Sequence, residues 1–201
     1  SLITAGRSYP LEICVVDNGD STDDSAWLLS LAQRGKVATY VRNAGNRSFG
    51  WSRNAALFLT HCPWVIVSDN DILVPLDGKW ITALLQPFVE HPEEKIITSP
   101  FRYTDEREKY QAPKLGKYDC NLRAGSNFFL AKRITFAEIG LFKWHRIAGS
   151  LFTDELVRAG YRTAIVPDTG IKDAGLRQGY NHRAALKIEI PLTNGDAFKL
   201  V

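Results

Sequence analysis

The chain has 201 residues, 45% of them hydrophobic and 23% charged, and its 25 basic and 22 acidic side chains give a net charge of +3. This length suits one domain with a buried core, and the composition excludes a disordered or low-complexity chain. The basic residues are few and scattered, which argues against a nucleic-acid-binding protein.

Apolar runs that end in acids or turn formers alternate with segments of helical period, the pattern of an α/β layer protein. The first half is expected to contain strands at 11–17, 36–41, 64–68 and 95–99 and helices at 25–34, 51–61 and 80–88. The second half is expected to contain a loop at 103–117, strands at 126–131 and 161–166, helices at 133–139 and 150–159, and a weaker strand signal at 186–190. Because no repeat or linker interrupts this alternation, a single domain is expected over residues 1–201.

The three cysteines, Cys14, Cys62 and Cys120, lie far apart and form no C-x-x-C pair. This spacing argues against a disulfide framework or a zinc site. No apolar run approaches the ~18 residues that a membrane span requires, and no signal peptide is expected. A cytoplasmic location is therefore expected, with membrane association through other parts of the protein left open.

Acids stand at the carboxyl ends of two expected strands. Asp17 is the last residue of the first strand, and Asp69-Asn70-Asp71 directly follows the strand at 64–68. Open α/β sheets bind ligands outside the carboxyl ends of their strands. Residues i and i+2 of an extended chain project to the same side, so the Asp69 and Asp71 carboxylates can converge. At ~4 Å they would repel by about 4 kcal/mol, and a divalent cation such as Mg²⁺ or Mn²⁺ would turn that repulsion into attraction. The pattern predicts a cation site that docks a diphosphate.

Five segments, in order, resemble family 2 inverting glycosyltransferases of the GT-A fold. They are LEICVVDNGDSTDDS from residue 11, RNAG with SRNAAL from residues 42 and 52, WVIVSDND from residue 64, GSNFFLAKRITFAEIGLF from residue 125, and TDELVRAGYRTAIVP from residue 153. The resemblance covers roughly residues 8 to 170. It implies a GT-A-like domain, Rossmann-related, with a mixed, mostly parallel sheet flanked by helices. Residues 1–100 would then form the nucleotide-sugar-binding half, and residues 101–201 the acceptor-side half and tail.

The resemblance also implies roles for individual residues. Asp154 is the expected catalytic base, with Glu155 as the second choice. The expected nucleotide-sugar-binding residues are Asp17, Asn18, Asn43, Arg53, Asp69 and Asn70. The expected metal ligands are Asp69, Asp71 and Asp173, with His182 as the alternative to the last.

The sequence departs from the family pattern at three places. Thr153 replaces the Glu that usually precedes the Asp154 position, and Asp173 stands near the place of a usual His. The family's first strand is missing from the chain, which would leave an exposed internal edge in the sheet. We expect that strand to come from residues outside the sequence or from another chain.

The function implied is metal-dependent, inverting sugar transfer from a nucleotide-diphosphate donor, with UDP as the expected nucleotide, to an acceptor hydroxyl. The acceptor could be a saccharide, a lipid-linked compound or another hydroxyl compound, including one near a membrane, and oligomerisation stays open. One alternative is a catalytically degenerate sugar-nucleotide-binding or scaffolding domain. Another is a sugar nucleotidyltransferase, which should carry a Gly-rich phosphate loop after its first strand.

Overall fold

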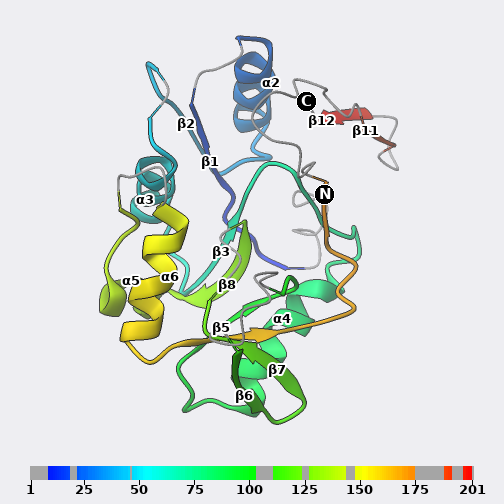
Figure 1. Cartoon of the computed structure of the whole chain (residues 1–201). Helices are drawn as coiled ribbons and strands as arrows, with labels where there is room; N and C mark the ends of the chain where they lie inside the picture. Colours follow the sequence, from blue (N-terminus) through cyan, green and yellow to red (C-terminus); the bar gives the residue numbers. More distant parts are fainter. Residues whose placement is uncertain are drawn as a thin grey trace.

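A computed structural model describes residues 9–18, 22–45, 47–102, 111–123, 127–143, 148–174, 188–191 and 197–200 (Figure 1). The largest sheet has six strands in the order β3 (Trp64–Ser68), β8 (Phe128–Lys132), β5 (Ile96–Ser99), β9 (Arg162–Ile165), β7 (Tyr118–Asn121) and β6 (Gln111–Leu115). The other strands form three pairs, which are β1 (Cys14–Asp17) with β2 (Thr39–Arg42), β4 (Ile72–Leu73) with β10 (Lys172–Asp173), and β11 (Ile188–Pro191) with β12 (Ala197–Leu200). The helices are α2 (Thr22–Gln33), α3 (Phe49–Leu59), α4 (Lys79–Glu90), α5 (Arg133–Ile139) and α6 (Ala148–Arg158).

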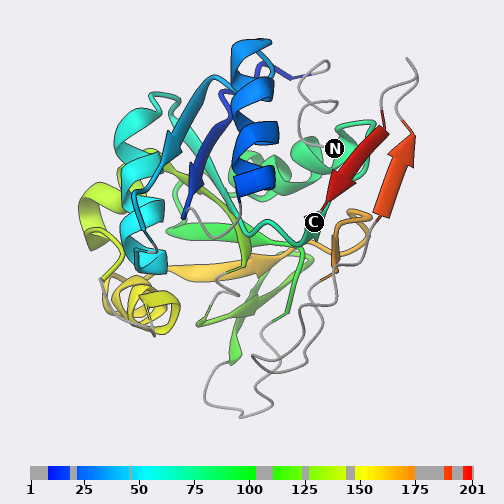
Figure 2. The same cartoon turned by 90° about the horizontal axis from the view of Figure 1, so that it is seen from above.

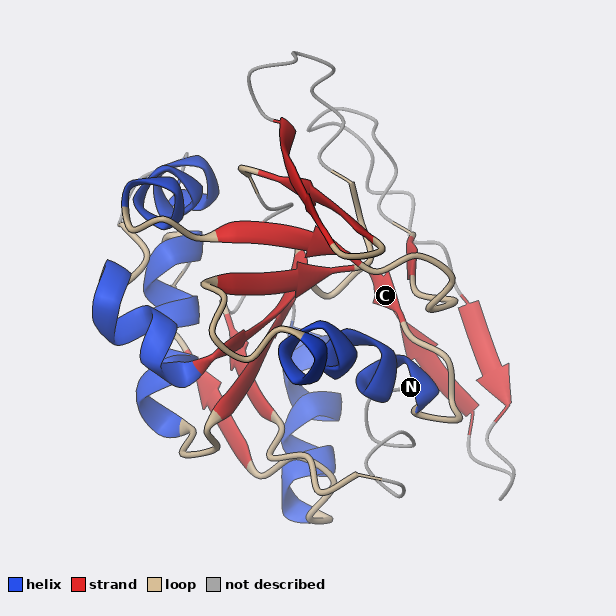
Figure 3. Ribbon diagram, turned by 90° about the horizontal axis from the view of Figure 1, so that it is seen from below, coloured by secondary structure: helices blue, strands red, loops and turns tan. Residues whose placement is uncertain are grey.

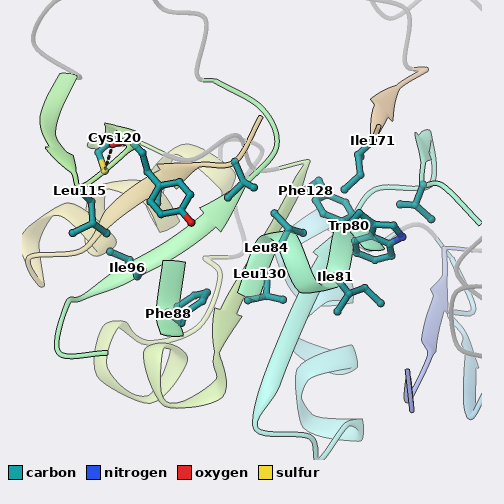
Figure 4. Close-up of a cluster of buried hydrophobic side chains, with 14 of the residues drawn as sticks. Trp80, Ile81, Leu84, Phe88, Ile96, Leu115, Cys120, Phe128, Leu130 and Ile171 are labelled. Carbon is teal, nitrogen blue, oxygen red and sulfur yellow. Dashed lines mark hydrogen bonds between the residues drawn. The ribbon is translucent and has the colours of Figure 1, made fainter. Parts of the chain in front are cut away.

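Helices cover both faces of the six-stranded sheet, which confirms the expected α/β domain with a mixed central sheet (Figure 3). Because side chains alternate along a strand, neighbouring residues of β5 and β8 enter different cores. Ile96, Phe128 and Leu130 pack with Trp80 and other residues of α4 on one face (Figure 4). On the other face, Ile97, Phe129 and Ala131 pack with residues of α3, α5 and α6.

The expectation of a mostly parallel sheet is wrong. Within the six-stranded sheet only β5 and β9 are parallel, whereas the β3–β8, β5–β8, β7–β9 and β6–β7 pairs are antiparallel. The expected helices separate most successive strands, though not those at 95–99 and 126–131, and such helical crossovers are what parallel neighbours require. The described chain has no helix between β5 and β8, so β6, β7 and β8 join the sheet without such a crossover.

The strongest expected strands and helices are confirmed, often with shorter bounds. The loop expected at 103–117 is wrong at its C-terminal part, because Gln111–Leu115 forms β6 in a hairpin with β7. The two-residue strands β4 and β10, and β7 and β12, carry no clear periodic signal and were missed. The weaker signal at 186–190 overlaps β11, which pairs with β12 beside the rest of the molecule (Figure 2).

The β1–β2 pair stands apart from the edge strand β3, since no pairing joins β1 to β3 in the described part of the chain. A cavity of about 150 Å³ lies between them. Its walls come from the start of β1, the whole of β3 and one side of α3, through Glu12, Cys14, Arg53, Ala56, Leu57, Thr60, Cys62, residues 64–68 and Arg133. The expected first strand and its origin stay a prediction.

Among the described residues, no helix has both the length and the apolar character needed to span a bilayer.

Candidate active site

The end of β1 forms a tightly hydrogen-bonded group. The Asp17 carboxylate accepts hydrogen bonds from the hydroxyls of Tyr40, at 2.8 Å, and Ser25. The next side chain, Asn18, accepts at Oδ1 from Asn43 Nδ2 at 2.8 Å and from Ser52 Oγ at 2.9 Å. Asn18 and Asn43 therefore join the end of β1 to the loop after β2 and to α3, which is an organising role for two residues predicted to bind the donor.

The first turns of α3 connect this hydrogen-bonded group to the end of β3. Ser48 caps the helix by accepting from the Trp51 N–H, as expected for a Ser at an N-cap. Ser52 then contacts Asn18 on the β1 side, and the adjacent Arg53 forms an ion pair with Asp69, directly after β3. Two consecutive helical residues thus bring the predicted residues of β1 and β3 into one site.

Arg53 is an unusually buried cation for a site near the protein surface. Its side chain is 10% exposed, and its guanidinium carbon lies 3.4 Å from the ring centroid of Phe49 and 5.3 Å from that of Phe142. Burial lowers the pKa of Arg53 to about 10, against the opposing effect of Asp69. Among the side chains that the structure describes, Arg53 Nη1 is a buried nitrogen with no hydrogen-bond partner. Such an unsatisfied donor is costly unless a ligand oxygen meets it.

Asp69 lies in an environment that disfavours its charge, although a cation contacts it. Burial raises the pKa of Asp69 above its usual range, and the Arg53 guanidinium opposes that rise. Asp71 and Asp173 raise the pKa of Asp69 further by charge repulsion, so the structure brings all three predicted metal ligands within electrostatic range.

Backbone contacts of β10 bring Asp173 to the edge that carries Asp69 and Asp71, although it lies much later in the chain. Asp173 pairs with Ile72 in the short β4–β10 ladder, and the Ala174 N–H donates to the Asp71 carbonyl at 2.9 Å. In the part of the chain that is described, no group of three or more His, Cys, Asp or Glu side chains is arranged to hold a metal. The three acids therefore share one edge without forming a ready-made three-ligand cage.

A tight turn before β10 makes this approach possible. Gly170 has φ of +70°, and a Cβ added to it would lie 2.9 Å from Pro75 Cγ. Asp168, two residues earlier, also has a positive φ, of 58°. The glycine both adopts the left-handed conformation and lets the chain pass close to the segment after β4, so it fixes where Asp173 arrives.

The predicted base Asp154 belongs to a neighbouring group on α6. Its carboxylate forms an ion pair with Arg123, which follows β7, whereas Glu155 pairs with Arg158 within the same helix at 2.6 Å. The ring of Phe152 stacks on Phe142 with centroids 4.2 Å apart, and Phe142 in turn lies beside Arg53. This aromatic contact ties the position of α6 to the Arg53–Asp69 pair.

The remaining predicted residues divide into exposed and undescribed ones. Asn70 and Asp71 are exposed between β3 and β4. His182, the alternative metal ligand, lies outside the described residues. Sequence reasoning missed Ser25, Tyr40, Arg123 and Asn127, all of which contact predicted site residues. Only Asn127 had a usable signal, since it lies near the start of the GSNFFLA strand segment.

A sequence model of glycosyl transferase family 2 matches residues 1–149. The chain belongs to this family. The match contains Asp17, Arg53, Asp69 and Asp71 of the candidate site and ends before Asp154. A search of curated proteins found no significant match.

Solved glycosyltransferase structures share the fold of this family 2 domain. A mannosyltransferase, PcManGT from Pyrobaculum calidifontis, in complex with GDP-Man and Mn²⁺, matches with a TM-score of 0.62 and 19% identity, over 85% of this chain and 49% of that one. GalNAc-T7 with UDP, GalNAc and Mn²⁺ matches with a TM-score of 0.59 and 15% identity, over 80% of this chain and 37% of that one. S. aureus TarS, residues 1–349 with UDP-GlcNAc, matches with a TM-score of 0.58 and 16% identity, over 84% of this chain and 50% of that one. The chain thus spans half or less of the length of these proteins.

Proposed function

We propose that the domain transfers a sugar from a nucleotide-diphosphate donor, with UDP as the expected nucleotide, to an acceptor hydroxyl with inversion. The observation that carries this proposal is the Asp69–Arg53 pair beside Asp71 and Asp173, where clustered carboxylates adjoin a buried, unsatisfied guanidinium N–H. A diphosphate supplies acceptor oxygens for that N–H, and a divalent cation would offset the clustered negative charge. The nucleotide or nucleotide-sugar complexes of PcManGT, GalNAc-T7 and TarS support the same donor class.

The residues at this edge fit Mn²⁺ or Mg²⁺. Magnesium sites for phosphate ligands commonly use one or two protein carboxylates together with water and the phosphates themselves. Asp71 and Asp173 would be those carboxylates, whereas Asp69 is already paired with Arg53. When bound, the cation would act as a Lewis acid that neutralises charge on the departing diphosphate. A three-ligand protein cage is therefore not required, in keeping with the geometry of the three acids.

The donor would be held at both ends by groups that the fold already orients. Asp17, fixed by Tyr40 and Ser25, would contact the base, and Arg53 Nη1 would donate to the diphosphate. Because Arg53 is stacked on Phe49 and paired with Asp69, it approaches the phosphate with little freedom left to lose.

Asp154 would act as the general base. As the acceptor oxygen attacks the anomeric carbon, its proton passes to the Asp154 carboxylate, and the bond from that carbon to the diphosphate oxygen breaks. This single displacement inverts the anomeric centre and releases the nucleoside diphosphate. The contact with Arg123 orients the carboxylate, and Phe152 anchors the helix that bears it.

The proposal is tested by measuring donor binding and sugar transfer with Mn²⁺ or Mg²⁺ across a panel of nucleotide sugars and acceptors. Asp71→Ala should abolish cation-dependent donor binding, and Asp154→Ala should keep donor binding but lose transfer. The matched control is Glu155→Ala, which removes the adjacent carboxylate of the same helix and should retain transfer. Donor binding without turnover under every acceptor condition would instead favour a binding or scaffolding domain, and full transfer by Asp154→Ala would refute the assignment of the base.

A further inference from the structure

Asn127 contacts two of the three clustered acids, Asp69 and Asp173. Its backbone carbonyl accepts from the Asp69 N–H at 2.8 Å, which continues the β3–β8 ladder by one bond. Its side-chain Nδ2 donates to Asp173 Oδ2 at 2.8 Å. One residue at the start of β8 therefore fixes the backbone of the first acid and the carboxylate of the last.

The chemical type of this donor differs from the one that serves Asp69. Asp69 contacts a guanidinium, a full positive charge that would compete with a metal ion for the carboxylate. Asp173 accepts from Asn127, a neutral amide that orients the carboxylate and leaves its negative charge in place. The Asn127 amide therefore orients the carboxylate without bringing a charge that competes with a cation.

The location of Asp173 gives such a partner a role. It lies on a strand of only two residues, Lys172–Asp173, and its side chain is exposed. The β4–β10 ladder positions its backbone next to Asp71 but does not determine where the carboxylate points. The amide of Asn127, directly before β8 of the six-stranded sheet, donates the hydrogen bond that orients it.

We propose that Asn127 is a positioning residue that holds the Asp173 carboxylate beside Asp71 for the divalent cation. This inference rests on the proposed function, because it assigns the cation to Asp71 and Asp173. Hydrogen-bond partners of metal ligands typically contribute about 10- to 100-fold to metal affinity. Asn127 should contribute at the lower end, since Asp173 is exposed and only one of several ligands.

The test is a titration with Mn²⁺, in the absence and presence of saturating UDP, followed by the electron paramagnetic resonance signal of free Mn²⁺. Asn127→Ala should weaken Mn²⁺ binding by about 10-fold. The matched control is Gln86→Ala, which removes another exposed amide that donates to a carboxylate, that of Glu90 at 3.1 Å on α4. The control should leave the Mn²⁺ affinity unchanged.

A double-mutant cycle separates positioning from a general structural role. If Asn127 acts through Asp173, then Asn127→Ala should cause no further loss in an Asp173→Ala background. Urea unfolding would establish that each variant folds. If Asn127→Ala does not fold, Asn127→Ser takes its place, since its shorter side chain withdraws the donor from Asp173.

The outcomes distinguish this inference from the proposed function. A wild-type Mn²⁺ affinity in Asn127→Ala, or an equal loss in the Asp173→Ala background, would overturn the positioning role alone. No Mn²⁺ binding by the wild-type protein, with or without UDP, would overturn it together with the cation role proposed for Asp71 and Asp173.

Discussion

Two ion pairs in different parts of the molecule differ in the direction in which the pKa of the carboxylate is shifted. On α4, Glu90 contacts Lys117 of the β6–β7 turn at 2.8 Å, and the hydrogen bonds from Lys117 and Gln86 lower the pKa of Glu90 to about 2. At the candidate site Asp69 also contacts a cation, Arg53, yet burial and two neighbouring acids raise its pKa.

This difference in pKa shift separates a structural ion pair from one at a candidate functional site. The charge of Glu90 is satisfied by the cation and the amide that contact it, and the Glu90–Lys117 pair joins the β6–β7 hairpin to α4. The Arg53–Asp69 pair combines burial, an unsatisfied N–H and repulsion from Asp71 and Asp173, an arrangement that folding alone does not favour. Perturbed charges of this kind gather at functional sites, where a ligand supplies the missing partner.

The largest expected effect comes from breaking the Arg53–Asp69 pair, of which the cation is buried. Arg53→Met keeps much of the packing on Phe49 but leaves Asp69 without its cation, so the free energy of unfolding should fall by about 2–3 kcal/mol. Urea unfolding measures this change. Arg102→Met, which breaks the exposed pair with Asp119, is the control and should cost less than about 1 kcal/mol. Equal losses in the two variants would show that the Arg53–Asp69 pair is not special.

A smaller effect tests how Asp173 reaches the site. Gly170→Ala and Gly160→Ala both force alanine into the left-handed conformation, at φ of +70° and +80°, which costs about 1–2 kcal/mol each. Only at Gly170 would the added Cβ lie against Pro75, since nothing lies within 4 Å at Gly160. Gly170→Ala should therefore weaken Mn²⁺ binding beyond its effect on stability, whereas Gly160→Ala should not. Unchanged Mn²⁺ affinity in Gly170→Ala would contradict the role assigned to the turn.

The smallest effect is a difference in the sign of two pH dependences. The folded-state pKa of Glu90 lies below the ordinary 4.5, so the unfolded chain binds more protons between pH 2 and 4.5. The contribution of Glu90 is thus present above pH 4.5 and lost as the pH falls toward 2. The folded-state pKa of Asp69 lies above the ordinary 3.8, so its contribution falls as the pH rises from 3.8 through the folded-state pKa.

Unfolding of the wild type, Glu90→Gln and Asp69→Asn at a series of pH values from 2 to 7 measures both contributions as differences. The advantage of the wild type over Glu90→Gln should grow with pH, and its advantage over Asp69→Asn should shrink. Parallel curves for the two variants would contradict the opposing environments described here.

Much of the fold followed from local patterns that were strong and continuous. The apolar run before Asp69 and the alternation around Phe128 and Phe129 predicted β3 and β8, because a buried strand needs such side chains whatever its neighbours are. The direction of each strand was not predictable in the same way. It depends on which strand a later segment pairs with. The side chains of β6 are mostly exposed and of mixed type, with no clear period.

The sequence by itself determined which acids end the strands, Asp17 and Asp69, and where the helix bearing Arg53 begins, since caps and strand ends are local properties. Only the tertiary structure decided that Arg53 is buried against Asp69, and that Asp173, more than one hundred residues later in the chain, comes beside Asp71 with Asn127 as its partner. Those contacts depend on a two-residue ladder, a glycine turn and single hydrogen bonds between distant segments. Their free energy comes from close approach in three dimensions, which leaves almost no trace in local sequence.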